Sequence, residues 1–265
     1  MNFLLSCDDG LRAEGTRALA AELARMGEVR ACAPEHHCSG AGHAVTLNAP
    51  VCTRPADLAH CERAVAVEGS PADAVKLALA QLWPDWADLV VSGINRGPNV
   101  GVNVFYSGTV GAAAEGAVLG VSAVALSMDI SERFDFELAA GHARPVLERL
   151  AQVAPFPPGT LFNVNLPAAE VNPRGIRLTR HGRSGFREYY RPRGEPDASG
   201  ACYWEVQGDF RVHDPDEGYD AAALAGGWIS VTPMFLDLTA DSYREPPEGR
   251  TEGLEALLEK LVDWR

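Results

Sequence analysis

The sequence predicts an α/β fold built on a mostly parallel, Rossmann-like sheet flanked by helices. Two short apolar runs, Asn2–Cys7 and Val29–Ala33, are typical of buried strands. Between them Glu14–Met26 carries apolar residues at helical spacing and is followed by a natural stop at Gly27. This strand–helix–strand order predicts a parallel pair with a right-handed crossover. A third apolar run, Leu89–Val91, ends in a glycine-rich loop where a helix cannot begin at once.

The other elements of the first 170 residues continue this alternation. Residues 41–68 are expected to form irregular β structure, with apolar alternation at 64–67. Ser70–Asp73 has the composition of a helix start, namely a capping serine, a proline at the first position and an acidic first turn. We expect helices over 70–82, 108–119 and 134–153, the last kinked or restarted by Pro145, and strands over 121–128 and 160–166.

The last third of the chain has a different character. Between 174 and 193 it holds seven arginines, and strands near 175–181 and 201–207 suggest an extended hairpin or arm. A solvated basic loop on an acidic protein is an equally good interpretation. Residues 227–233 should return to the core as a strand, and Glu252–Trp264 has the leucine stripe of an amphipathic tail helix. We therefore predict one domain over 1–265, with a core (1–170), an arm (171–226) and a returning strand with the tail (227–265).

Composition limits the classes of function. Hydrophobic residues make up 46% of the 265 residues, enough for a sizeable core. A formal net charge of −13 argues against nucleic acid or an anionic membrane as partner. Six cysteines lack CxxC spacing, and we find neither a membrane-spanning apolar run nor a signal-peptide pattern. A reduced, cytoplasmic setting is the expectation.

Polar side chains follow three of the predicted strands. Asp8 and Asp9 come after the first strand, where open α/β sheets place their ligands, and two adjacent carboxylates call for a compensating cation or hydrogen bonds. Ser39 lies in the loop after the second strand, and asparagines 95, 99 and 103 are spread through the loop after Val91. Each feature alone is compatible with ordinary turn chemistry. The helix start at 107–109 has free backbone amides of the kind that bind phosphate.

In combination these segments resemble the SurE family, the survival-protein-E nucleotidases. The matching motifs keep the family's order and span nearly the whole chain: Leu4-Leu5-Ser6-x-Asp8-Asp9-Gly10, Ala33-Pro34-x4-Ser39-Gly40, Gly69-Ser70-Pro71-Ala72-Asp73, Val91-Ser92-Gly93-Ile94-Asn95-x-Gly97-Pro98-Asn99, Tyr106-Ser107-Gly108-Thr109-Val110, Asn163-Val164-Asn165-Leu166-Pro167 and Ser230-Val231-Thr232-Pro233.

The resemblance implies a divalent-metal-dependent phosphatase acting on nucleoside monophosphates. One ion per subunit would be held by Asp8, Asp9, Ser39 and Asn95, an all-oxygen set that suits Mg²⁺ or Mn²⁺ better than zinc. The phosphate would be held by Asn99, Ser107, Gly108 and Thr109. Whether Asp8 attacks phosphorus, acts as a base or only binds metal is not decided by spacing, so Asp8 and Asp9 are both candidate catalytic residues. The resemblance also implies a homodimer or homotetramer, with the arm and tail reaching a neighbouring subunit.

Three positions depart from the family pattern. Cys7 stands where asparagine is common, Gly42 where serine is common, and Asp241 where a histidine is often found. Of the two loop histidines near the predicted site, 36 and 37, neither is assigned a catalytic role. We expect hydrolysis of nucleoside 5′- and 3′-monophosphates to nucleoside and phosphate. The alternatives are an exopolyphosphatase or another small phosphomonoester phosphatase, a nucleotide-binding sensor without turnover, and a purely structural oligomer.

Overall fold

The computed structural model describes residues 1–130, 134–197 and 199–238. The chain divides into two compact units, 1–234 and 235–265, and the elements below belong to the first, apart from the last residue of its final strand. The predicted tail helix and Asp241 lie outside the described residues. Within the described part of the chain, every helix is too short or too polar to cross a membrane.

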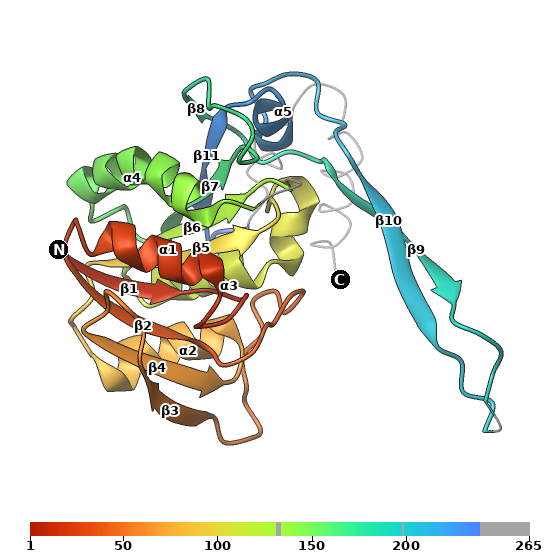
Figure 1. Cartoon of the computed structure of the whole chain (residues 1–265), viewed down its shortest axis with the longest axis horizontal. Coiled ribbons are helices and arrows are strands. Elements are labelled where there is room, and N and C mark those ends of the chain that lie inside the picture. The colour runs from red at the N-terminus through yellow and green to blue at the C-terminus, as the bar shows by residue number, and fades with distance from the viewer. Residues whose placement is uncertain (131–133, 198, 239–265) are drawn as a thin grey trace, which may run out of the picture. The chain divides into compact units, whose positions relative to one another are not determined.

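The first unit is built on a nine-stranded sheet with the order β3-β4-β2-β1-β5-β6-β7-β11-β8 (Figure 1). The strands are β1 (Asn2–Ser6), β2 (Glu28–Pro34), β3 (Cys52–Ala56), β4 (Arg63–Glu68), β5 (Leu89–Arg96), β6 (Ser122–Met128), β7 (Thr160–Leu166), β8 (Ile176–Leu178) and β11 (Ile229–Phe235). β4, β2, β1, β5, β6 and β7 run parallel, and β3 pairs antiparallel with β4 at one edge. The predicted α/β fold with a mostly parallel sheet is confirmed.

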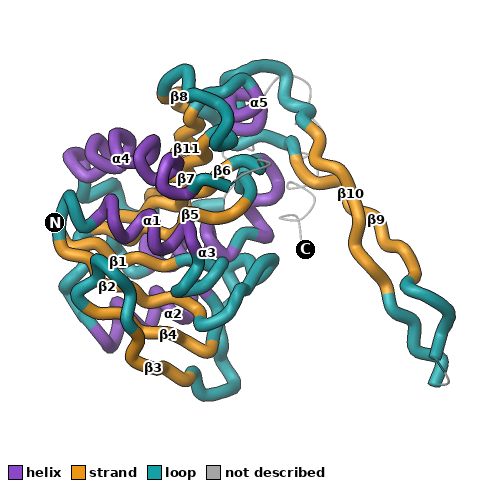
Figure 2. The backbone as a smooth tube through the Cα atoms, in the orientation of Figure 1, coloured by secondary structure: helices purple, strands orange, loops and turns teal. Residues whose placement is uncertain are grey.

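Helices cover both faces of this sheet (Figure 2). They are α1 (Glu14–Leu23), α2 (Pro71–Leu77) continued by the short η1 (Ala78–Leu82), α3 (Gly108–Val118), α4 (Phe136–Val153) and α5 (Asp220–Ala225), with a 3-10 turn η2 (Gly101–Tyr106) before α3. Because side chains of a strand alternate between faces, Phe3 and Leu5 belong to one core with α1 and α4, whereas Val90 meets Gly116 of α3 on the other face.

Two local expectations are changed by the structure. The third strand of the sequence prediction runs from Leu89 to Arg96, so that β5 includes Asn95 as well as the apolar run. β5 does so through a register shift against β6 between Ser92 and Asn95. Helix α4 runs through Pro145 as one element rather than restarting there. Its N-cap Asp135 accepts a hydrogen bond from the Leu138 amide, 2.9 Å long.

A separate two-stranded antiparallel sheet is formed by β9 (Gly185–Pro192) and β10 (Trp204–Arg211). The predicted hairpin therefore exists, but its first strand is Gly185–Pro192, and the prediction near 175–181 is wrong. Residues 176–178 form β8, which pairs in parallel with β11 in the main sheet. A strand of a hairpin and an edge strand of a larger sheet show the same short alternating pattern in sequence. The pairing of β8 with a strand more than 50 residues later therefore could not be recognised from the sequence around it.

Candidate functional site

The carboxyl end of β1 delivers the first carboxylate of the site. Asp8 is buried, with 3% of its surface exposed. Burial raises the pKa of Asp8, the hydrogen bond from the Thr109 hydroxyl lowers it, and the nearby Asp9 carboxylate raises it again. The net shift is upward, which means that Asp8 carries a charge that the surrounding protein does not fully compensate.

Asp9 joins three segments of the chain. Its Oδ2 accepts a hydrogen bond of 2.9 Å from the backbone amide of Arg96 at the end of β5. Its Oδ1 lies 3.0 Å from Nδ1 of His37, in the loop after β2. The carboxyl ends of β1, β2 and β5 therefore meet at this residue, as expected for neighbouring parallel strands.

The start of α3 contacts the same carboxylate, Asp8. Ser107 caps the helix by accepting a 3.1 Å hydrogen bond from the Val110 amide. At Gly108 a Cβ atom would lie 2.8 Å from the Asp8 Cβ, so only glycine lets the helix start approach this carboxylate so closely. Thr109 is fully buried and donates its hydroxyl hydrogen to Asp8 Oδ1. The predicted phosphate-binding segment and the predicted metal-binding carboxylate are thus in direct contact.

The other two predicted metal ligands, Ser39 and Asn95, each adjoin in sequence a residue whose backbone amide donates to Asp8 or Asp9. Ser39 is exposed and follows Cys38, whose amide donates a 2.7 Å hydrogen bond to the Asp8 carbonyl. Asn95 precedes Arg96, whose backbone amide donates a hydrogen bond to the Asp9 carboxylate. Its side-chain Nδ2 donates to the Gly97 carbonyl at 2.7 Å, so the amide oxygen lies on the opposite side of the group.

Asn99 has a different environment from the other predicted phosphate ligands. Its backbone amide donates to Asn165 Oδ1 at 2.8 Å and its side-chain amide to Ser127 Oγ at 2.7 Å. Its carbonyl accepts from the side chain of Asn163 at 2.7 Å. These bonds tie the loop after β5 to the ends of β6 and β7, and the role of Asn99 toward phosphate stays a prediction.

The donor chemistry fits a hard divalent cation. Among the described residues, no lysine or arginine forms an ion pair with Asp8 or Asp9. In the same part of the chain no group of three histidines, cysteines or acids is arranged as a metal site, so a hydroxyl and an amide would have to complete the set. Burial raises the pKa of the Cys7 thiol well above its ordinary value, and the Asp8 carboxylate raises it further. A thiol kept protonated in this way is a poor ligand.

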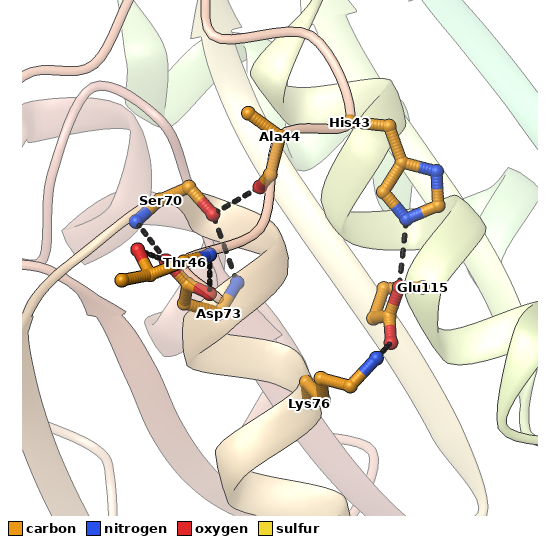
Figure 3. A network of polar contacts seen from close by, with 7 residues as sticks. All are labelled: His43, Ala44, Thr46, Ser70, Asp73, Lys76 and Glu115. Carbon is orange, nitrogen blue, oxygen red and sulfur yellow. Dashed lines mark hydrogen bonds and ion pairs between the residues drawn. The ribbon is translucent and has the colours of Figure 1, made fainter. Parts of the chain in front are cut away.

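Sequence reasoning missed a polar network around the loop that carries Ser39 (Figure 3). Glu115, the one charged residue of α3, lies between His43 of this loop and Lys76 of α2. Asp73, predicted only as part of a helix start, forms a complete capping box with Ser70 and also binds Thr46. In the sequence, the one indication that Glu115 has a structural role is that it is a single acidic residue within a helix of small residues.

The fold and the site define a Rossmann-like α/β protein with an acidic, oxygen-rich centre at the carboxyl edge of its sheet. The family model described as "Survival protein SurE" matches residues 3–188. A protein of Thermosipho melanesiensis named 5′-nucleotidase SurE is 38% identical over 253 residues, which cover 95% of this chain and 98% of that protein. A protein of Symbiobacterium thermophilum with the same name is 40% identical over 243 residues, covering 89% and 93%.

A solved structure agrees with these relatives. The crystal structure of the SurE protein from Aquifex aeolicus superposes with a TM-score of 0.78 at 33% identity, covering 97% of this chain and all of that one. The chain belongs to the SurE family.

Proposed function

We propose that this member of the SurE family is a divalent-metal-dependent phosphomonoesterase that hydrolyses nucleoside 5′-monophosphates, and also 3′-monophosphates, to nucleoside and phosphate. The observation that carries the proposal is the hydrogen bond between Thr109 and Asp8, which joins an anion-binding helix start to a buried carboxylate. The curated relatives named 5′-nucleotidase, at 38–40% identity over most of the chain, support the same reaction class.

In this proposal Asp8, Asp9, Ser39 and Asn95 hold one Mg²⁺ or Mn²⁺ ion. When bound, such an ion lowers the pKa of water and neutralises charge on the phosphoryl group. Asp8 and Asp9 supply the negative charge that retains the ion. The backbone amides at the start of α3 orient the phosphate oxygens, and the Thr109 hydroxyl, whose hydrogen is donated to Asp8, holds that carboxylate beside them.

The test is phosphate release from AMP by the purified protein with Mn²⁺, with Mg²⁺ and with EDTA. We expect turnover that is lost with EDTA and restored by either ion. A panel of 5′- and 3′-nucleotides, short polyphosphate and p-nitrophenyl phosphate then ranks the substrates. Faster release from polyphosphate than from any nucleotide would favour the exopolyphosphatase alternative. Binding of AMP without phosphate release would instead favour the nucleotide sensor.

We also propose that the protein is a homodimer or homotetramer. In the β9–β10 hairpin, opposite residues share a face, and one face pairs Tyr190 with Val206 and Pro192 with Trp204. The side chains of Tyr190, Val206 and Trp204 are 64%, 53% and 58% exposed. An isolated two-stranded sheet is marginally stable in water, so an apolar face on one supports burial against a second subunit.

A further inference from the structure

The loop between β2 and β3, residues 35–51, carries Ser39 and contains no helix or strand. It exceeds the length of roughly 12–15 residues beyond which structureless loops are uncommon and usually functional. Gly40 and Gly42 have φ values of +75° and +56°, so the backbone on the far side of Ser39 is intrinsically adaptable. Something outside the loop must therefore fix where Ser39 lies.

Contacts on both sides of Ser39 hold this loop. Before it, the Cys38 amide donates to the Asp8 carbonyl at 2.7 Å. After it, the Gly42 amide donates to the Tyr106 carbonyl at 3.0 Å, and His43 Nε2 donates to Glu115 Oε2 at 2.8 Å. The His43 contact is the side-chain anchor nearest to Ser39 on this side, and it is visible in Figure 3.

Glu115 is unusual for its helix. The sequence of α3 is otherwise glycine, alanine, valine and threonine, and the Glu115 side chain is only 4% exposed. A buried carboxylate is costly unless each oxygen finds a donor. Here Lys76 Nζ binds Oε1 at 2.8 Å and His43 binds Oε2, so both oxygens are engaged. Of these two donors, only His43 belongs to the loop.

We propose that Glu115 and His43 form a positioning pair that fixes Ser39 relative to Asp8. Helix α3 carries Thr109, which binds Asp8, at its start. Glu115, which binds the loop, follows less than two turns later in the same helix. The helix thus holds the carboxylate and the hydroxyl loop in one rigid frame. The inference rests on the proposed function, because it assigns Ser39 a place in the metal site.

A second set of hydrogen bonds should keep the loop folded when the contact between His43 and Glu115 is removed. Asp73 of α2 accepts from the Thr46 amide at 2.8 Å and from its hydroxyl at 2.7 Å, and Ser70 Oγ donates to the Ala44 carbonyl at 2.5 Å. These contacts, drawn in Figure 3, secure the loop beyond His43. Variants at His43 should therefore stay folded while the Ser39 segment loosens.

The experiment compares His43→Leu, His43→Gln and Lys76→Met in the full-length protein. Mn²⁺ affinity is measured by calorimetry without nucleotide, and kcat and KM are measured with AMP. We expect His43→Leu to weaken Mn²⁺ binding and lower kcat by about tenfold or more, as outer-sphere partners of metal ligands do. Gln places its amide nitrogen near the position of Nε2, so His43→Gln should recover most of the loss. Lys76→Met removes the other donor of the same carboxylate and should leave Mn²⁺ affinity unchanged.

Wild-type Mn²⁺ affinity in His43→Leu, or an equal loss in Lys76→Met, would overturn the proposal. Hydrogen exchange at the Gly42 amide provides a readout that does not depend on activity. Faster exchange in His43→Leu but not in His43→Gln supports the pair, and unchanged exchange in His43→Leu contradicts it. If the wild-type protein neither binds Mn²⁺ nor releases phosphate, the proposed function fails by itself, and the exchange rates still decide whether the pair holds the loop.

Discussion

The hydroxyl of Thr109 donates to Oδ1 of Asp8, a residue 101 positions earlier in the chain. This one bond connects the end of β1 with the start of α3, and it partly offsets the burial that raises the pKa of Asp8. A buried carboxylate with a raised pKa lowers stability when it is ionised, an arrangement typical of functional sites.

Replacing Asp8 by asparagine should therefore stabilise the metal-free protein at neutral pH. The pKa of Asp8 is raised on folding, so its ionised form opposes folding, and this cost appears as pH rises from the ordinary aspartate range through the raised value. Below that range both states are protonated and the advantage of Asp8→Asn should vanish. Unfolding by urea in EDTA between about pH 3 and pH 7.5 measures this difference. A variant less stable than wild type at every pH would show that the ionised Asp8 carboxylate does not destabilise the folded protein.

Gly111, near the start of α3, sets the distance between this helix and the loop of Ser39. A Cβ at Gly111 would lie 2.3 Å from the Gly42 carbonyl oxygen, which is backbone and cannot rotate away. Gly111→Ala should lower the free energy of unfolding by about 1–3 kcal/mol, as overpacking does. A Cβ added at Gly141 in α4 would meet no atom within 4 Å. Gly141→Ala is the matched control and should stabilise by roughly 0.5–1 kcal/mol in denaturant unfolding.

That the Asp8–Asp9 segment lies near the segment of Asn95 could be predicted because carboxyl ends of parallel strands share one edge of a sheet, and the bond from the Arg96 amide to Asp9 joins these two segments. Membership of the fold class followed from the same strand–helix–strand periodicity. The contact of His37 with Asp9 could not be predicted, since a loop conformation decides which of two adjacent histidines faces the carboxylate. Nor could the pairing of β8 with β11, because its register is set by partners distant in sequence.

The glycine at position 42, one of the departures from the family pattern, is explained by the backbone conformation of its loop. Serine is common at this position in the family pattern, yet here the residue has a φ of +56° and a Cβ would lie 3.1 Å from the Phe105 carbonyl. Backbone angles of this kind favour glycine over serine. The departure is therefore accommodated by the conformation of the loop, which the sequence alone does not specify.

Asp73 should make stability depend on pH in the opposite sense to Asp8. Burial alone would raise its pKa, but hydrogen bonds to the Asp73 carboxylate from the Thr46 amide and hydroxyl and from the Ser70 amide outweigh burial and lower the pKa. A lowered pKa contributes stability above the unfolded value of about 3.9, and this contribution is lost as pH falls through the folded value. Asp73→Asn should cost about 2 kcal/mol at pH 7. The gap to wild type in denaturant unfolding should narrow below pH 4, and a gap independent of pH would contradict this account.

The two faces of the hairpin allow a matched test of assembly. Tyr190 lies on the apolar face opposite Val206, and Tyr189 lies on the other face opposite Gln207. Tyr190→Ser should weaken the oligomer and shift light scattering toward smaller species at low micromolar concentration. Tyr189→Ser removes the same kind of side chain and should leave the mass unchanged. Equal effects of the two substitutions would indicate that the apolar face is not the contact, and a monomeric wild-type protein would remove the oligomer proposal.

The separate segments of the site should behave as one centre if they share an ion. Asp8→Asn removes a charge while keeping shape, so it should abolish turnover and weaken Mn²⁺ binding strongly. Asn95→Ala removes a neutral ligand and should weaken binding less. Because either loss disables the same centre, the double variant should be little worse than Asp8→Asn alone.

Asn103, which accepts a 3.1 Å hydrogen bond from the Phe186 amide at the hairpin base, is the control, and Asn103→Ala should bind Mn²⁺ normally. Calorimetric titration and AMP kinetics on the four proteins test the assignment. Additive losses, or an Asp8→Asn variant that keeps Mn²⁺ affinity, would show that these residues do not bind a common ion.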